Sequence, residues 1–251
     1  MLVVEDLKVK VGDKIVLDHI DLEIRPGETH VLFGPNGSGK TSLLMTIMGY
    51  PQYEVIEGRI RFKDVDITHL PIHERARLGI GMSYQRPPAI HGLKTRQLVR
   101  LCAKGEVDEE SLAEEVKFKD FLDRDVNVGF SGGEIKRSEL LQLLAQDPDL
   151  MMFDEPESGV DLENIALVGN TIAEMLQKNG RFRGDKTKMQ MRMERTKMGL
   201  IITHTGHILD YVSADKGQVL YNGRLSCTTN PREILRCIAE SGYGECVRCL
   251  T

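Results

Sequence analysis

The residues best suited to chemistry form a glycine-rich run that fits the pattern G-x-x-x-x-G-K-[ST]. Its members, with the serine that follows, are Gly34, Pro35, Asn36, Gly37, Ser38, Gly39, Lys40, Thr41 and Ser42. Glycines allow consecutive backbone N–H groups to point inward around phosphates. In this pattern the lysine reaches the β- and γ-phosphates, and the threonine hydroxyl ligands Mg²⁺. The run predicts a site for Mg-ATP; the alternative is a glycine-rich turn with a solvent-exposed lysine.

A second candidate site is acidic and comes much later in the chain. The apolar run Leu150–Phe153 ends in Asp154 and Glu155. An aspartate at the end of a buried strand can hold Mg²⁺, and an adjacent glutamate can orient a water molecule for attack on the γ-phosphate. Two acids after an apolar strand are common by themselves, so the interpretation depends on the phosphate loop. We expect Asp154 to be a metal ligand and Glu155 to be catalytic.

Both sites need strands and helices that hold them. Glu28–Phe33 is typical of a buried strand that leads into the glycines, and Lys40–Met48 is typical of a helix that leaves them. Leu150–Phe153 and Gly199–Thr203 predict further buried strands. Strands that alternate with helices favour a largely parallel sheet. We therefore expect an α/β fold of the P-loop NTPase class.

Turn residues mark the two ends of this core. Gly12-Asp13 separates two segments of alternating apolar residues, which predicts an antiparallel N-terminal β subdomain. Asn222-Gly223 predicts a tight β-hairpin near the other end. A last helix should start after Asn230-Pro231 and fade near Gly242.

Residues 86–145 differ from the core in sequence pattern, which predicts a mainly helical subdomain. Leu112–Leu122 suggests an amphipathic helix, and Ser131 with Glu134 forms a capping box at the start of another helix. The subdomain would interrupt a catalytic core formed by residues 1–85 and 146–251. The whole chain is thus expected to be one domain.

The residues after Phe130 resemble a family signature. Ser131, Gly132, Gly133 and Glu134 resemble the signature of ATP-binding cassette ATPases, in which the last residue is usually glutamine. The resemblance implies that Ser131, Gly132 and Gly133 bind the γ-phosphate of a nucleotide held by a second copy. It also implies that ATP drives head-to-tail pairing of two chains.

Other positions match the same family. Gln85 resembles the glutamine that touches Mg²⁺ and nucleotide, and Asp161 lies in a segment that resembles the loop at the dimer interface. His204 resembles the switch histidine that contacts the γ-phosphate, which makes it a second catalytic candidate. Besides Glu134, a second position departs from the family, because Val11 stands where an aromatic residue often stacks on adenine.

Local segments resemble one branch of the family, the Suf-type iron–sulfur cluster assembly ATPases. These segments are residues 130–137, residues 154–161, Thr203-His204, residues 208–211 and Gly242-Tyr243-Gly244. This resemblance implies a Suf-type scaffold subunit as partner, docked near Gln85 and residues 86–91. The alternative is the nucleotide-binding subunit of an ABC membrane transporter. A third reading, a cassette that only switches on ATP, is disfavoured because Glu155 and His204 are both present.

Five cysteines form a sparse, odd-numbered set, which argues against a disulfide framework and for a reducing compartment. We therefore expect a cytoplasmic protein. In the tail, residues 237–251, Cys246 and Cys249 have a spacing that could hold an iron–sulfur cluster or zinc shared with a partner. An inert or redox-labile pair is the alternative.

The composition of the chain limits the classes of partner that we expect. The 251 residues carry a net charge of −5, so neither nucleic acid nor an anionic membrane surface is expected as a partner. No apolar run reaches the roughly 18 residues of a membrane span, so contact with a membrane would be indirect, as in the transporter reading. Residues 181–198 stand out as a basic, methionine-rich insertion, either a docking surface or a solvated loop.

Overall fold

A computed structural model of the chain describes residues 1–178 and 194–250. Its central sheet has the strand order β12-β11-β3-β10-β9-β6, and all neighbours pair in parallel except the hairpin β11–β12. The strands are β3 (Thr29–Phe33), β6 (Ile80–Ser83), β9 (Leu150–Asp154), β10 (Met198–Ile202), β11 (Lys216–Tyr221) and β12 (Arg224–Leu225). Every residue of β3, β6, β9 and β10 is buried, as expected for a parallel sheet covered on both faces. The predicted α/β fold with a mostly parallel sheet is confirmed.

A second, antiparallel sheet has the order β2-β1-β4-β5 and contains the N-terminus. Its strands are β1 (Leu2–Val11), β2 (Lys14–Ile24), β4 (Glu54–Phe62) and β5 (Val65–Asp66). Gly12 has φ 58 in the turn between β1 and β2, which confirms the predicted turn. The apolar face of this sheet packs with α1 (Lys40–Met48) and one face of the central sheet into a single apolar cluster.

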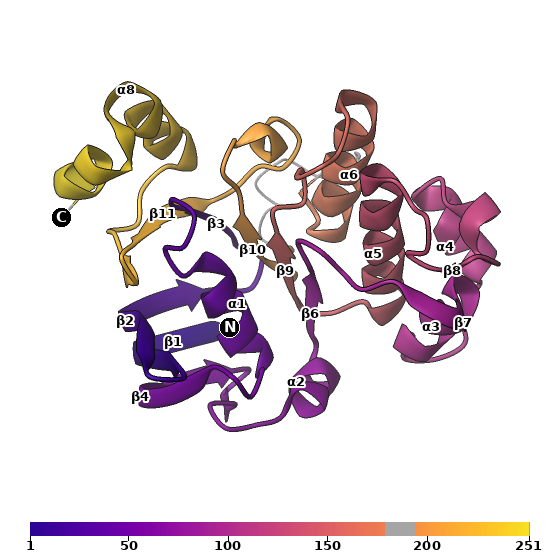
Figure 1. Cartoon of the computed structure of the whole chain (residues 1–251), viewed down its shortest axis with the longest axis horizontal. Helices are drawn as coiled ribbons and strands as arrows, with labels where there is room; N and C mark the ends of the chain where they lie inside the picture. The colour runs from indigo at the N-terminus through magenta and orange to yellow at the C-terminus, as the bar shows by residue number, and fades with distance from the viewer. Residues whose placement is uncertain (179–193, 251) are drawn as a thin grey trace.

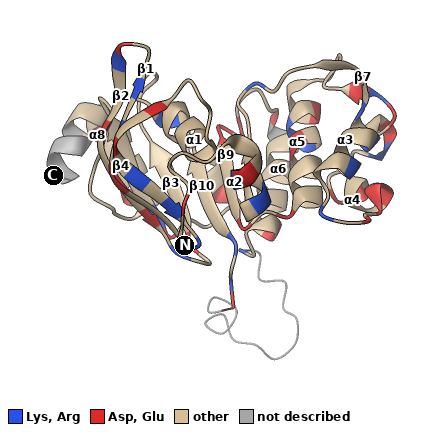
Figure 2. Cartoon of the chain, turned by 90° about the horizontal axis from the view of Figure 1, so that it is seen from below, with Lys and Arg blue, Asp and Glu red and all other residues tan. Residues whose placement is uncertain are grey.

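The other face of the central sheet is covered by helices (Figure 1). Among the described residues, the remaining α-helices are α2 (Ile72–Leu78), α3 (Thr95–Cys102), α4 (Glu109–Glu115), α5 (Gly132–Gln146), α6 (Leu162–Met175) and α8 (Pro231–Leu250). α3 and α4 lie with the short strands β7 (Ile90–Lys94) and β8 (Asp125–Val126) at one end of the molecule. Figure 2 shows charged residues mostly on the outer elements, whereas β3, β9 and β10 are largely uncharged. The subdomain boundaries at residues 86 and 145 stay a prediction.

The expected helix over Leu112–Leu122 is wrong. α4 ends at Glu115, Lys117 adopts a left-handed conformation with φ 50, and a separate 3₁₀ turn, η1 (Lys119–Phe121), follows. The apolar residues keep their helical spacing across the break, but the backbone does not keep its helical conformation.

Phe118 gives the physical reason for this break. Its N–H donates to the Ala113 carbonyl at 2.7 Å, which closes α4. Its ring is fully buried and lies 4.9 Å from the Phe121 ring and 5.5 Å from the Phe130 ring, between centroids. Burial of this aromatic ring stabilises the fold more than a further turn of α4 would. The chain therefore leaves the helix at Lys117, which allows Phe118 to be buried.

The C-terminal part differs from expectation in one respect. Asn222 (φ 49) and Gly223 (φ 76) form the predicted hairpin turn, and α8 begins at Pro231 as predicted. Gly242 is non-helical (φ 74, ψ 172), but the helix resumes beyond it to Leu250 instead of fading. Most of the basic insertion lies outside the described residues. In the described part of the chain, no helix is long and apolar enough to cross a membrane.

One buried cation ties α1 to α2. Arg75 of α2 is 3% exposed, and its guanidinium donates to four backbone carbonyls, those of Thr46, Ile47, Thr68 and Leu70, at 2.7–3.0 Å. Burial lowers the pKa of Arg75 to about 10, which still leaves it charged at neutral pH. Two of these carbonyls belong to the last turn of α1, so Arg75 closes the helix that leaves the phosphate loop.

Replacing this arginine should be costly. We expect Arg75→Met to lower the free energy of unfolding by about 3 kcal/mol, because buried carbonyls lose a charged donor. Arg77→Met, on the exposed side of the same helix, should change it by less than about 0.5 kcal/mol. Urea unfolding followed by circular dichroism measures both. Equal effects of the two variants would contradict the assigned role of Arg75.

Candidate nucleotide site

The phosphate loop joins β3 to α1. α1 begins at Lys40, and its N-cap, Gly39, makes no side-chain capping bond, so the N–H groups of the first turn are left for a ligand. A Cβ at Gly34 would lie 2.2 Å from the Leu220 carbonyl oxygen, and one at Gly39 would lie 2.8 Å from the Val16 carbonyl oxygen. Only glycine fits these two positions. The tight backbone forms an anion cradle at a helix N-terminus.

Lys40 lies inside this cradle and is 5% exposed. Its Nζ donates to the carbonyl oxygens of Gly34 at 2.8 Å and Pro35 at 2.9 Å. Burial lowers the pKa of the Lys40 ammonium, and the nearby charges of Glu155 and Asp154 raise it in part. The lysine is therefore the buried cation of the loop, within reach of both acids, and not the solvent-exposed residue of the alternative reading.

Asp154 ends β9 next to the start of α1. The Thr41 hydroxyl donates to Asp154 Oδ2 at 2.9 Å, while Asp154 Oδ1 is buried without a hydrogen-bond partner among the described residues. Burial raises the pKa of Asp154, and the charge of Glu155 raises it further. A buried carboxylate oxygen without a partner, beside a hydroxyl, is the donor set that a hard cation needs. Thr41 and Asp154 therefore fit Mg²⁺.

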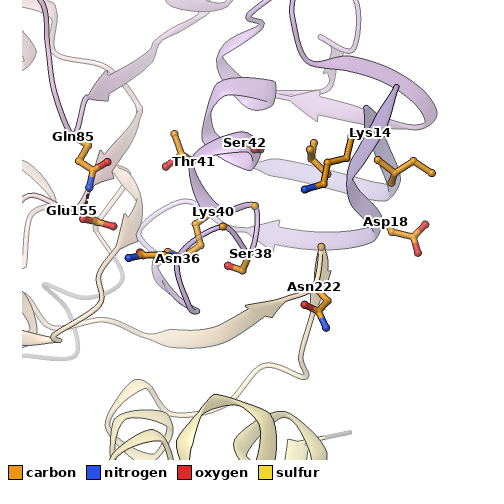
Figure 3. A pocket seen from close by; sticks show the side chains of 15 residues that line it. Lys14, Asp18, Asn36, Ser38, Lys40, Thr41, Ser42, Gln85, Glu155 and Asn222 are labelled. Carbon is orange, nitrogen blue, oxygen red and sulfur yellow. Dashed lines mark hydrogen bonds between the residues drawn. The ribbon is translucent and has the colours of Figure 1, made fainter. Parts of the chain in front are cut away.

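Glu155 is the point where three segments meet. Gln85 Nε2 donates to Glu155 Oε2 at 2.6 Å (Figure 3). His204 Nε2 contacts Glu155 Oε1. Gln85, Glu155 and His204 follow the carboxyl ends of β6, β9 and β10, which are adjacent strands. Parallel sheets bring such ends to one edge, where ligands bind.

Gln85 and Glu155 border a cavity of about 590 Å³, which His204 does not line. Its lining is Lys14, Ile15, Val16, Asp18, Asn36, Gly37, Ser38, Gly39, Lys40, Thr41, Ser42, Gln85, Glu155, Asn222 and Gly223. The residues from β2 and from the hairpin turn were not predicted as site residues. Ile15 is 49% exposed, and an exposed isoleucine beside a phosphate loop is the signal that could have found them. Ile15 and Val16, and not Val11, supply the apolar wall.

The predicted signature residues lie elsewhere, together with Asp161. Ser131 caps α5 through the predicted capping box, with its N–H donating to Glu134 Oε2 at 2.7 Å. A Cβ on Gly132 would lie 2.0 Å from the Gly159 carbonyl oxygen, and Asp161 caps α6. Neither Ser131–Gly133 nor Asp161 is part of the cavity lining. One chain thus brings the phosphate loop and the acids together, but not the signature.

The predicted cysteine site has no support in the described residues. Cys246 is fully buried in the apolar cluster under the helices, and the side chain of Cys249 lies outside the described residues. Among the residues that can be described, no group of three or more His, Cys, Asp or Glu side chains could hold a metal ion. A metal at Cys246 and Cys249 stays a prediction.

Comparisons with known proteins decide the family. Residues 17–158, more than half of the chain, match the family described as ABC transporter. The chain is an ATP-binding cassette ATPase. The cassette is 36% identical to the "Probable ATP-dependent transporter ycf16" of Cyanidium caldarium, over 90% of this chain and 88% of the relative. It is 33% identical to the "Probable ATP-dependent transporter SufC" of Escherichia coli (strain K12), over 97% and 98% of the two chains.

Solved structures show the same fold. A nucleotide-free ATP-binding cassette from an ABC transporter superposes on this cassette with a TM-score of 0.76 at 23% identity, covering 98% of each chain. A bacterial Atm1-family ABC exporter with ATP bound gives a TM-score of 0.77 at 19% identity, covering 98% of this chain and 41% of the exporter. Membership of the family means that this cassette binds Mg-ATP and hydrolyses it.

Asp154 provides a test of the metal site. Asp154→Asn keeps the acceptor for Thr41 but removes the charge, so Mg²⁺-dependent phosphate release should fall by about 100-fold. Without metal, the same variant should be more stable than wild type. The raised pKa means that ionised Asp154 destabilises the metal-free fold, a cost that grows as pH rises from the unfolded pKa to the folded pKa.

A second aspartate serves as its control. Burial tends to raise the pKa of Asp149, but ion pairs with Lys63 and Lys197 leave it below the usual value. Asp149→Asn should therefore lower stability and leave turnover intact. Thermal unfolding in EDTA and a phosphate-release assay measure both variants. An Asp154→Asn protein that hydrolyses ATP normally would refute the assignment.

Proposed function

We propose that this cassette hydrolyses ATP with Glu155 as the residue that orients the attacking water, and that it works on a Suf-type scaffold subunit for iron–sulfur cluster assembly. The observation that carries the proposal is the convergence of Gln85 and His204 on the two carboxylate oxygens of Glu155, next to the phosphate loop. A carboxylate held from both sides keeps one orientation toward a water molecule.

The neighbouring residues take complementary roles in this scheme. Thr41, Asp154 and Gln85 would hold Mg²⁺, which neutralises charge on the phosphates when it is bound. Lys40 would exchange the carbonyls of Gly34 and Pro35 for phosphate oxygens, with the glycine-rich backbone donating around them. His204 would donate to the γ-phosphate or hold the water with Glu155. Each residue would act from the end of a buried strand or from the first turn of α1.

We further propose that a second copy completes the site. Ser131–Gly133 and Asp161 lie together at the starts of α5 and α6, outside the cavity. A helix N-terminus with a serine and two glycines suits a phosphate oxygen, which here must come from another chain. Head-to-tail pairing would set the signature of each copy over the phosphate loop of the other.

Two variants separate hydrolysis from pairing. Glu155→Gln should keep ATP binding, lose at least about 100-fold in turnover and run as a dimer with ATP in size-exclusion chromatography with light scattering. Ser131→Arg should bind ATP with wild-type affinity but stay monomeric, because Ser131 is remote from its own cavity. Wild-type turnover by Glu155→Gln would refute the catalytic role, and a dimer of Ser131→Arg with ATP would refute the pairing.

The choice of a scaffold partner is supported by sequence similarity and by a groove. The similarity to the E. coli protein named SufC extends over 97% of this chain. A groove of about 400 Å³ adjoins Gln85 and is lined by Arg86, Pro87, Pro88 and Ile90, among others. Its lining is mainly apolar, and residues 86–91 are the segment expected near the partner. The odd set of cysteines supports a cytoplasmic setting for this complex.

The groove gives a test with a matched control. Ile90 is 37% exposed and Ile56, on β4 away from the groove, is 40% exposed. Ile90→Asp should abolish co-purification of the scaffold, whereas Ile56→Asp should not, and both should keep basal ATP turnover. Affinity purification from the native host, with mass spectrometry of the captured proteins, measures this. Retention of the scaffold by Ile90→Asp would refute the docking site.

A transporter subunit is the second candidate. The names of several relatives contain the words "ATP-dependent transporter", and the similar solved structures come from ABC transporters. In that case a membrane permease would occupy the same groove. The purification above decides between the two, since a permease in place of a scaffold would overturn the assembly proposal while leaving the ATPase intact.

A further inference from the structure

The loop after β9 carries another carboxylate, Glu157, that the catalytic scheme does not use. Glu157 is 9% exposed. Its Oε1 accepts from the Thr203 hydroxyl and, at 3.2 Å, from the Thr205 hydroxyl. Thr203 and Thr205 are the two neighbours of His204 in the sequence. One carboxylate oxygen therefore holds the chain on both sides of the histidine.

Other hydrogen bonds also hold the segment that carries His204, among them one from the Thr203 N–H to the Leu32 carbonyl at 3.4 Å. The Thr203 hydroxyl accepts from the Gly206 N–H at 2.8 Å, and Gly206 has φ 75, a left-handed turn that favours glycine. The Glu155 N–H donates to the Ile202 carbonyl at 3.1 Å, just before this segment. These bonds end β10 and turn the chain, and none of them is made by residue 204 itself. The side chain of Glu157 links the two loops directly.

Burying this carboxylate is costly, which argues against a purely structural role. Glu157 Oε2 is buried and has no hydrogen-bond partner among the described residues. Burial raises the pKa of Glu157, and the charge of Glu155 contributes in the same direction. An apolar side chain of similar size would remove the unpaired Oε2, but it would also take away the acceptor of the buried Thr203 hydroxyl. A buried polar atom without a partner calls for an explanation, and a role in catalysis is one such explanation.

We propose that Glu157 is a positioning residue for ATP hydrolysis, which holds His204 against Glu155 through the hydroxyls of Thr203 and Thr205. Glu157 is not part of the cavity lining, and its assigned partners are the hydroxyls of Thr203 and Thr205. Its effect reaches the reaction through the imidazole, whose Nε2 contacts Glu155. The inference rests on the catalytic role proposed for His204.

A double-mutant cycle tests the route of this effect. We expect Glu157→Ala to lower kcat by about tenfold, while KM for ATP changes by less than about twofold. In a His204→Ala background, Glu157→Ala should cause no further loss, because the residue that it positions is gone. Losses that multiply in the double variant would overturn the inference. An unchanged kcat of His204→Ala alone would instead refute the catalytic role of His204, and the inference with it.

Milder variants keep the test decisive if Glu157→Ala fails to fold. Thr205 is exposed, so Thr205→Val removes one donor to Glu157 without disturbing the core, and Thr205→Ser keeps that donor. Thr205→Val should lower kcat by about threefold, and Thr205→Ser should match wild type. Glu157→Gln, which keeps an acceptor oxygen, should retain most of kcat. Circular dichroism melting checks that all variants are folded. Equal kcat for Thr205→Val and Thr205→Ser would overturn the inference.

Discussion

The parallel register of β3, β10 and β9 is the constraint on which the nucleotide site depends. Ile202 of β10 lies opposite Leu32 of β3 and Asp154 of β9. The acids begin at this level with Asp154, and the phosphate loop and His204 begin just after it, so they meet at one edge of the sheet. A slip by one residue would turn each side chain to the opposite face. Burial on both faces, at about 25 cal/mol per Å² of apolar surface, holds that register.

The stability of this sheet offsets the free-energy cost of the site, where some buried polar groups have no hydrogen-bond partner. Asp154 Oδ1, Ser38 Oγ and Glu157 Oε2 are buried without hydrogen-bond partners among the described residues. Each such group costs about 1–3 kcal/mol. A sequence selected only for stability would not contain these groups. Binding of a metal and phosphates, or control of a loop, explains why they are present. Other buried atoms without a hydrogen-bond partner lie away from the site, among them the two ring nitrogens of His30, and the apolar clusters on both faces of the sheet offset the whole cost.

Predictions succeeded where a feature is local. The boundaries of α1, the capping box of Ser131 and Glu134, and the Asn222-Gly223 turn depend on residues within a few positions of one another. They failed where a distant contact overrides the local pattern. The apolar spacing of Leu112–Leu122 continues through Lys117, yet the helix breaks there because Phe118 packs against Phe130. Helix propensity differs by less than about 1 kcal/mol per residue, and aromatic burial exceeds that.

The sequence by itself determined the chemistry: a phosphate loop at Lys40, an acidic pair at Asp154 and the family signature at Ser131 are readable because each needs particular residue types at short spacing. Only the tertiary structure decided which of these groups meet. It joined Gln85 and His204 to Glu155, put Ile15 beside the phosphate loop, kept Ser131 away from it, and made Glu157 a link to the segment of His204. The physical reason is that such meetings follow from strand order and register, which arise from the packing of the whole sheet.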